Sequence, residues 1–385
     1  MNRIYLDYSA TTPLATDVLA AMQPYLIEHF GNASSIHGFG REAKVAVDAA
    51  REQLATALGA QPQEIAFTSG GTEAANLAIF GVAHTFSESR HIVTSRIEHP
   101  CVLNPCRELE KSGWQVTYVE PDMTGMISAS AVAAAIRSDT ALISIMHANN
   151  EVGTINPIIE IAQLAADRKI IFHTDAVQAF GKLPIDVRQN PLSLLSLSGH
   201  KIYGPKGMGA LFVRRGVKLQ PILFGGHQER ERRAGTENVV GIVGLGKAAE
   251  LMIANQAHES ARLRALAENF LKKIQQIFPG ATLNGHLESR LQSVLNLSFP
   301  GFESTALLMS LDLQGIAVSN GSACSSGSVE ISHVLRAMKL SRERAMSALR
   351  FSFGKYTTAA EVETTLQALT KILQRTNEPK FRTPS

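Results

Sequence analysis

The sequence has few cysteines, no long hydrophobic run and no excess of one charge. Its three cysteines, Cys101, Cys106 and Cys324, are odd in number and lack the paired spacing of a disulfide framework or a structural zinc site. No apolar run approaches the roughly 18 residues that a membrane-spanning helix needs. Asp7 interrupts the apolar N-terminal stretch, which argues against a secretory signal. These absences predict a cytoplasmic protein that does not bind a membrane.

Charge is low and mixed in sign. The formal net charge of +3 is too small to suggest a nucleic-acid-binding surface, and the densest charged cluster, residues 229–233, contains both acidic and basic side chains. Hydrophobic residues make up 45% of the 385 positions and charged residues 18%, as in an ordinary globular enzyme. The composition therefore predicts an enzyme with a sizeable core and no nucleic-acid partner.

Between residues 64 and 213, short β-rich runs alternate with helix-like segments. This alternation is typical of an α/β fold, with a mostly parallel sheet covered by helices on both faces. Ligands bind such folds at the carboxyl ends of the strands. The predicted strands are Glu64–Thr68, His91–Thr94, Gln115–Val119, Ala141–Met146, Lys169–His173, Leu192–Leu197 and Gly209–Arg214.

A second, smaller α+β unit is predicted after this sheet. A long helical segment, Val239–Phe278, leads into it, and it includes the β-rich runs Gln292–Ser298 and Ile316–Ser319 and a final helix, Ala359–Gln374. We expect residues 15–255 to form the large domain, and residues 1–14 and 256–385 to form the small one.

Lys201 is the first candidate catalytic residue. It follows the apolar run ending at Leu197 and precedes a Gly/Pro loop, residues 202–207, that prevents a continuing helix. An amine held in a cleft at a strand end is partly desolvated, has a lowered pKa and can form a Schiff base with an aldehyde. A solvated surface lysine is the alternative for this segment taken alone.

Asp175 is a second candidate residue, and it indicates which ligand Lys201 could bind. It closes another apolar run, and a carboxylate there needs a cationic partner such as a protonated pyridine nitrogen. Gln178, three residues on, could reach a second polar atom of the same ligand. A helix N-cap is the alternative for Asp175, but together Asp175 and Lys201 indicate a site for pyridoxal phosphate.

A phosphate site is indicated by Ser69-Gly70-Gly71-Thr72-Glu73, between a predicted strand and a predicted helix. Glycines allow close approach of an anion, and helix N-terminal amides favour negative charge. Thr72 could add a hydroxyl donor. A plain capping turn explains the segment equally well.

Further candidates also follow apolar runs. His99 could stack on a flat cofactor and move protons, although a lone histidine is more often structural. Asn150 could hydrogen-bond substrate or cofactor, or belong to a turn. Arg350, between large apolar residues, is suited to a substrate carboxylate or an internal salt bridge. Cys324 lies in a small polar Gly/Ser segment where a thiol is available as a nucleophile, whereas Cys101 and Cys106 have the neighbours of structural cysteines.

Together these motifs resemble the cysteine desulfurases, pyridoxal-phosphate enzymes of the class V aminotransferase group with fold type I. The segment Gly321-Ser322-Ala323-Cys324, with a long Ser/Gly stretch after the cysteine, is similar to the NifS/IscS branch. The resemblance implies conversion of L-cysteine to L-alanine, with the sulfur held as a persulfide on Cys324. It also implies a homodimer that passes sulfur to an acceptor protein, such as an iron–sulfur scaffold, or to thiolation.

The resemblance further implies a role for each matching residue. The Schiff base forms on Lys201, while His99 stacks on the ring and moves protons. The cofactor-binding set is Lys201, Gly71, Thr72, His99, Asn150, Asp175, Gln178, Ser198, His200 and, from the partner subunit, Thr236. The substrate carboxylate is held by Asn150 and Arg350, and no metal is implied.

Two other enzyme classes remain compatible with these residues. A cysteine or cystine C–S lyase of the same group, or a selenocysteine lyase, would not require Cys324. A binding protein that kept the fold without activity is a third alternative.

Overall fold

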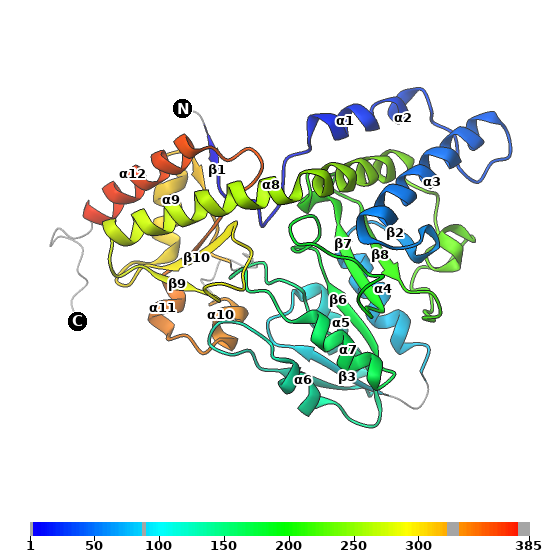
Figure 1. Ribbon diagram of the computed structural model, residues 1–385, viewed down its shortest axis with the longest axis horizontal. Coiled ribbons are helices and arrows are strands. Elements are labelled where there is room, and N and C mark those ends of the chain that lie inside the picture. The colour runs from blue at the N-terminus through cyan, green and yellow to red at the C-terminus, as the bar shows by residue number, and fades with distance from the viewer. Residues whose placement is uncertain (1–2, 87–89, 322–330, 376–385) are drawn as a thin grey trace.

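The computed structural model describes residues 3–86, 90–321 and 331–375. Within these residues, a seven-stranded sheet forms the centre of the larger unit, in the order β2-β8-β7-β6-β5-β3-β4 (Figure 1). Its strands are β2 (Ile65–Thr68), β3 (His91–Ser95), β4 (Gln115–Val119), β5 (Thr140–Ser144), β6 (Ile171–Asp175), β7 (Leu194–Ser198) and β8 (Gly209–Val213). The predicted α/β fold with a mostly parallel sheet is confirmed.

One strand departs from the parallel arrangement. β8 runs antiparallel to both of its neighbours, β7 and β2, because the chain reverses through a tight loop after β7. β2 and β7 therefore point the same way as the other parallel strands, so their carboxyl ends share one edge of the sheet.

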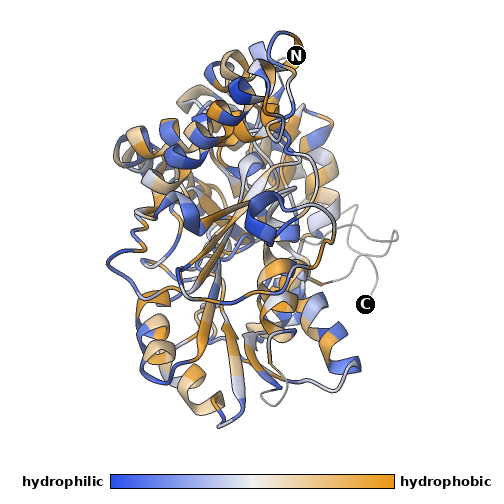
Figure 2. Cartoon of the chain, turned by 90° about the vertical axis from the view of Figure 1, so that its right-hand side faces the viewer, coloured by the Kyte–Doolittle hydropathy of each residue, from blue (hydrophilic) through white to orange (hydrophobic). Residues whose placement is uncertain are grey.

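Successive apolar side chains of the strands face opposite sides of the sheet. Ile92 and Leu142 pack in a cluster with α4 (Gly71–Ala83) and α5 (Pro100–Lys111), whereas Val93 and Ile143 pack on the other face with α3 (Gly38–Leu58) and α7 (Ile158–Asp167). A buried sheet with apolar residues on both faces needs this cover on each side. Figure 2 shows hydrophobic residues along the strands, and helices that mix hydrophobic and hydrophilic positions.

The remaining helices of the larger unit are short. They are α1 (Thr16–Met22), α2 (Pro24–Ile27) and α6 (Ala129–Ala135). Helices α4 and α6 begin at Gly71 and Ala129.

The smaller unit has its own hydrophobic core, to which Ile4 and Leu6 of the N-terminal segment contribute. Its three-stranded antiparallel sheet has the order β12-β10-β9, and β1 pairs with β11. The elements are β1 (Ile4–Tyr5), β9 (Thr282–Asn284), β10 (Val294–Ser298), β11 (Ile316–Ala317), β12 (Ala348–Ser352), α9 (Ser304–Asp312), α10 (His333–Ala337), α11 (Arg342–Met346) and α12 (Ala359–Arg375).

One long helix, α8 (Val239–Ile277), connects the two units (Figure 1). Its first half packs into the larger core through residues such as Leu245, and its second half packs into the smaller core through Phe270. The domain boundary expected near residue 255 thus falls inside a continuous helix. We propose that this helix, α8, belongs to both domains and that they meet along it.

Candidate active site

The carboxyl ends of five strands gather most of the predicted site residues around one cavity of about 400 Å³, which we call the central cavity. Gly71 and Thr72 follow β2, His99 follows β3, Asn150 follows β5, Asp175 ends β6, and Ser198 and Lys201 end or follow β7. The predicted residues that line it are Gly71, Thr72, His99, Asn150, Asp175, Gln178, Ser198, His200, Lys201 and Arg350.

Two predicted residues do not line the central cavity. Thr236 lies in a separate hollow with Gly207 and Arg233. Cys324 lies outside the residues that the structure describes. Ser319 and Gly321, just before it in sequence, do line the central cavity, so the chain that leads to Cys324 reaches this site.

Lys201 lies in a short 3₁₀ turn, Gly199–Lys201, directly after β7. Its Nζ donates to the carbonyl oxygens of Ser9 and Ala10, at 2.6 Å each. Burial and, next, the nearby Arg350 guanidinium lower the pKa of Lys201 to about 8. More of this amine is therefore unprotonated near neutral pH than of an exposed lysine, and the unprotonated form is the one that attacks an aldehyde.

Asp175 is the last residue of β6 and is 5% exposed. Its Oδ1 accepts from the Val177 amide at 2.9 Å, and its Oδ2 accepts from the Cys101 thiol at 3.7 Å. Burial raises the pKa of Asp175. A cation in the central cavity would reverse this shift, so the residue is suited to a protonated ring nitrogen.

His99 is the N-cap of α5, and its Nδ1 accepts from the Cys101 amide at 3.2 Å. Burial lowers the pKa of His99, with Lys201 and His333 acting in the same direction and Asp175 opposing them. The imidazole is therefore neutral near pH 7.

The N-terminus of α4 offers free backbone donors to the central cavity. Gly70 precedes the helix with φ +158° and supplies no side-chain cap. A Cβ on Gly71 would lie 2.7 Å from Val177 Cγ2, so a glycine allows the close packing here. The backbone amides at the start of α4, with Thr72, Ser198 and His200 around them, can hold a phosphate. Burial and neighbouring lysines lower the pKa of His200 to about 4, so its ring is a neutral hydrogen-bonding group.

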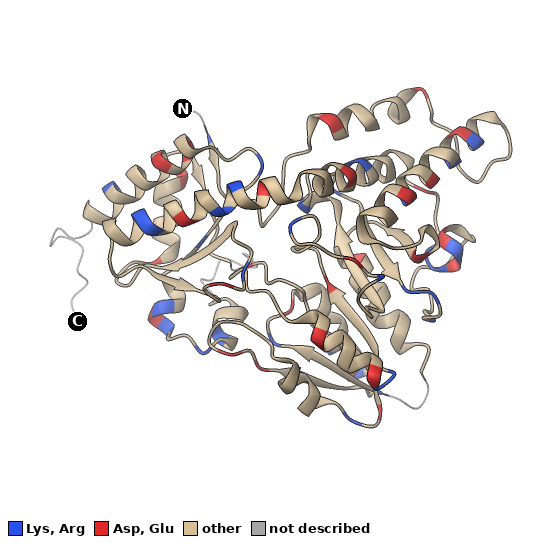
Figure 3. Ribbon diagram, viewed as in Figure 1, with Lys and Arg blue, Asp and Glu red and all other residues tan. Residues whose placement is uncertain are grey.

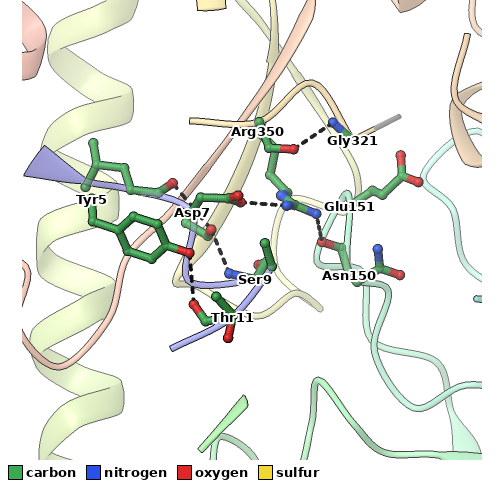
Figure 4. A network of polar contacts seen from close by, with 12 residues as sticks. Tyr5, Asp7, Ser9, Thr11, Asn150, Glu151, Gly321 and Arg350 are labelled. Carbon is green, nitrogen blue, oxygen red and sulfur yellow. Dashed lines mark hydrogen bonds and ion pairs between the residues drawn. The ribbon is translucent and has the colours of Figure 1, made fainter. Parts of the chain in front are cut away.

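Arg350 lies on β12, and it both forms an internal salt bridge and faces the central cavity. Its Nη2 is 2.7 Å from Asp7 Oδ1, and its Nη1 donates to the Asn150 carbonyl oxygen at 3.0 Å (Figure 4). The Nε of this 5%-exposed residue has no hydrogen-bond partner among the described residues. Because Arg350 lines the central cavity, its guanidinium is suited to bind a carboxylate there.

Sequence reasoning missed several residues that line the central cavity or pair with its side chains. Asp7 and the carbonyl groups of Ser9 and Ala10 come from the N-terminal segment, far from Lys201 in sequence. A single charge inside an apolar run was the available signal for Asp7. Cys101, expected to be structural, is indeed buried but also contacts Asp175; nothing in its local sequence indicated that contact.

Gln178 has partners at both ends of its amide. Its Nε2 donates to the Ser9 carbonyl oxygen at 2.8 Å, and its Oε1 accepts from Lys182 Nζ at 2.9 Å. Lys182 was not predicted to belong to the site.

Positive and negative side chains are interspersed over the molecule (Figure 3). In the described ranges, no group of three or more His, Cys, Asp or Glu side chains is placed to hold a metal ion. None of the helices described is both long enough and apolar enough to cross a bilayer.

Comparison with known proteins places this site in a family. The family model for "Aminotransferase class-V" matches residues 4–365. The "Cysteine desulfurase IscS" of Dictyoglomus turgidum is 49% identical over 375 residues, which cover 97% of this chain and 95% of that protein. The "Cysteine desulfurase IscS" of Methanosarcina thermophila is 49% identical over 382 residues, covering 99% of this chain and 94% of that protein.

Solved structures agree with these sequence relationships. A structure titled "NIFS-LIKE PROTEIN" has a TM-score of 0.92 at 37% identity and covers 97% of this chain and 100% of its own. A structure titled "SspA in complex with cysteine" has a TM-score of 0.83 at 41% identity, covering 93% of this chain and 100% of its own. The predicted resemblance to the NifS/IscS group and fold type I is confirmed.

Proposed function

Because this chain belongs to the aminotransferase class-V family and is a pyridoxal phosphate-dependent cysteine desulfurase, we propose that it converts L-cysteine to L-alanine with Cys324 as the sulfur acceptor. The observation that carries the proposal is the central cavity itself. It combines Lys201 and Asp175, which are suited to the cofactor, with the Arg350 guanidinium, which is suited to a carboxylate.

The residues of the central cavity fit pyridoxal phosphate from end to end. The uncapped amides at the start of α4, with Thr72, Ser198 and His200, would hold the phosphate. Asp175 would accept a hydrogen bond from the protonated ring nitrogen, Gln178 would donate to the ring oxygen, and Lys201 would bind the aldehyde carbon. When bound, the cofactor supplies an electron sink for the substrate's α-carbon.

The protein side chains bind the substrate and move protons. The Arg350 guanidinium and the Asn150 side chain would orient the carboxylate of L-cysteine. Lys201, with its lowered pKa, would remove the α-proton through Nζ. His99 would exchange a proton with the substrate sulfur.

Sulfur transfer balances without an external oxidant. The Cys324 thiolate attacks the substrate sulfur, an S–S bond forms and the substrate's C–S bond breaks. The substrate carbon skeleton, after protonation, leaves as alanine, and Cys324 keeps the persulfide. Only the thiolate is an effective nucleophile, so the proton of the Cys324 thiol must leave first.

The test compares Cys324→Ser with Cys101→Ser and Cys106→Ser. Each protein is incubated with L-cysteine, alanine and sulfide are measured, and the visible spectrum of the bound cofactor is recorded. We expect Cys324→Ser to keep its spectrum and lose nearly all alanine formation, because serine cannot accept the sulfur. We expect Cys106→Ser to remain active.

Full turnover by Cys324→Ser would contradict the proposal and favour a C–S lyase. Activity of this variant on selenocysteine alone would favour a selenocysteine lyase.

We further propose a cytoplasmic homodimer in which Thr236 reaches the partner's phosphate site. Two observations support the homodimer and the position of Thr236 in it. Thr236 lies outside the central cavity of its own chain. Large apolar side chains are exposed over residues 27–39, with Ile27 77%, Phe30 70% and Ile36 92% exposed.

An acceptor protein, such as an iron–sulfur scaffold or a thiolation protein, would take the sulfur from Cys324.

A further inference from the structure

Lys182 occupies an unusual position for a lysine. It lies partly buried beside the central cavity, in the wall of a second cavity of about 180 Å³ that Lys201 also lines and that we call the rear hollow. Across the described ranges, no carboxylate lies within ion-pair distance of Lys182. The carboxylate of Glu259 lines the rear hollow but is paired with Arg262.

The groups that face Lys182 are mainly basic. Burial, followed by the positive charges of Lys201 and Arg350, lowers the pKa of Lys182 to about 7, and Lys182 in turn helps to keep His200 neutral. A lysine in such a place costs free energy unless a specific contact repays it. Among the residues that the structure describes, Lys182 makes such a contact in its hydrogen bond to Gln178 Oε1.

That hydrogen bond fixes the orientation of the Gln178 amide. In its ammonium form Lys182 has three donors and no acceptor, so the amide can meet that form only with its oxygen. At its other end, Nε2 donates to the Ser9 carbonyl oxygen, which accepts from Lys201 as well. Both contacts therefore require the same orientation of the amide.

One N–H group of Gln178 remains available in this orientation. The amide nitrogen carries two hydrogens, and the Ser9 carbonyl takes one of them. Gln178 is 4% exposed and lines the central cavity, so a ligand there can take the other. If the amide were flipped, its oxygen would lie against Ser9 O and would repel an ionised ring oxygen.

We propose that Lys182 is a positioning residue that holds Gln178 with its N–H group toward the ring oxygen of bound pyridoxal phosphate. This inference rests on the proposed function of Gln178 as the donor to that oxygen. Its consequence is electronic, because a fixed donor stabilises the ionised ring oxygen over the neutral hydroxyl.

The test uses the holoenzyme and the absorbance of its bound cofactor. Ionisation of the ring oxygen is read from the ratio of the long-wavelength to the short-wavelength band, and the cofactor dissociation constant is measured in parallel. The proteins are wild type, Lys182→Met, Lys182→Arg, Gln178→Leu and the double variant. Lys247→Met is the control, because Lys247 lies on α8 and pairs with Glu250.

We expect Lys182→Met to lower the band ratio and to weaken cofactor binding about five- to ten-fold, the effect of one lost hydrogen bond. Lys182→Arg, which still donates, is expected to restore much of the ratio. The double variant is expected to match Gln178→Leu, because residues that act through one contact are not additive.

Three results would overturn the inference. They are an unchanged band ratio in Lys182→Met, a double variant whose effects add, and a Gln178→Leu variant with a wild-type ratio. None of these depends on whether the protein makes alanine from L-cysteine, so failure here is distinguishable from failure of the proposed function.

Discussion

At the residue scale, the cap that His99 makes on α5 determines which form of the ring can react. Nδ1 accepts from the Cys101 amide, so in the neutral ring the proton is on Nε2. A second proton would have to go on Nδ1 and would abolish the cap. The neutral His99 ring can therefore donate its proton from Nε2. It can accept a proton only on Nδ1, and it then loses the contact with the Cys101 amide.

The pH dependence of turnover tests this description of His99. Its pKa is lowered from the ordinary value, so the neutral ring persists to lower pH than in an exposed histidine. We expect the part of the acid limb that belongs to His99 to lie below about pH 6.5, the ordinary pKa of histidine, and therefore below any limb from Lys201, whose pKa is about 8. We expect His99→Asn, which can still cap the helix, to be much slower and to lose that acid limb.

An unchanged acid limb in His99→Asn would show that another group is responsible for it. His99→Ala, which lacks a cap as well, separates the two effects, because it is expected to destabilise α5 in addition to losing the limb.

Residue type and position were enough to predict the residues at strand ends, because each of Lys201, Asp175 and His99 follows its own apolar run. They were not enough to predict Lys182 or Ser9. These two meet the site through contacts between segments far apart in sequence, which no local pattern encodes.

At the element scale, the packing of β8 against the start of α4 depends on one glycine. A Cβ on Gly209 would lie 2.5 Å from the Gly70 carbonyl carbon and 2.6 Å from the Leu197 carbonyl oxygen, both backbone atoms. Neither can move without shifting β7 or the N-terminus of α4. The tight approach therefore holds the proposed phosphate site against the sheet.

We expect Gly209→Ala to lower the free energy of unfolding by about 1–3 kcal/mol, the usual cost of overpacking, and to weaken cofactor binding. Thermal unfolding of the apoprotein and cofactor titration measure the two effects. Gly38→Ala is the matched control, since the nearest atom that its Cβ would meet is Arg41 Nη2 at 4.0 Å. Equal midpoints for the two variants would contradict this account.

The order and type of the main elements were predictable because the apolar runs are short, regular and separated by helical patterns. The antiparallel direction of β8 was not, because strand direction depends on the path of the loop between Lys201 and Gly209 rather than on the strand's own residues.

At the scale of the whole molecule, each active site is proposed to need two subunits. A mixed dimer tests this, with Lys201→Ala in one subunit and Thr236→Val in the other. If Thr236 acts across the interface, one site of the mixed dimer has both defects and the other has neither. We expect each homodimeric variant to be impaired and the mixed dimer to regain about half of wild-type activity.

Activity no higher than the average of the two homodimeric variants would place Thr236 in its own subunit's site. A monomer in solution at working concentration would also contradict the proposal, and sedimentation measures it directly.

Locating the sulfur after one turnover tests directly whether Cys324 is the sulfur acceptor. Wild-type holoenzyme is mixed with sulfur-labelled L-cysteine without an acceptor or reductant, and its peptides are analysed by mass spectrometry. We expect one additional labelled sulfur atom on the peptide that contains Cys324, and none on those that contain Cys101 or Cys106. Alanine formed with all of the label released as free sulfide, and none on Cys324, would contradict it.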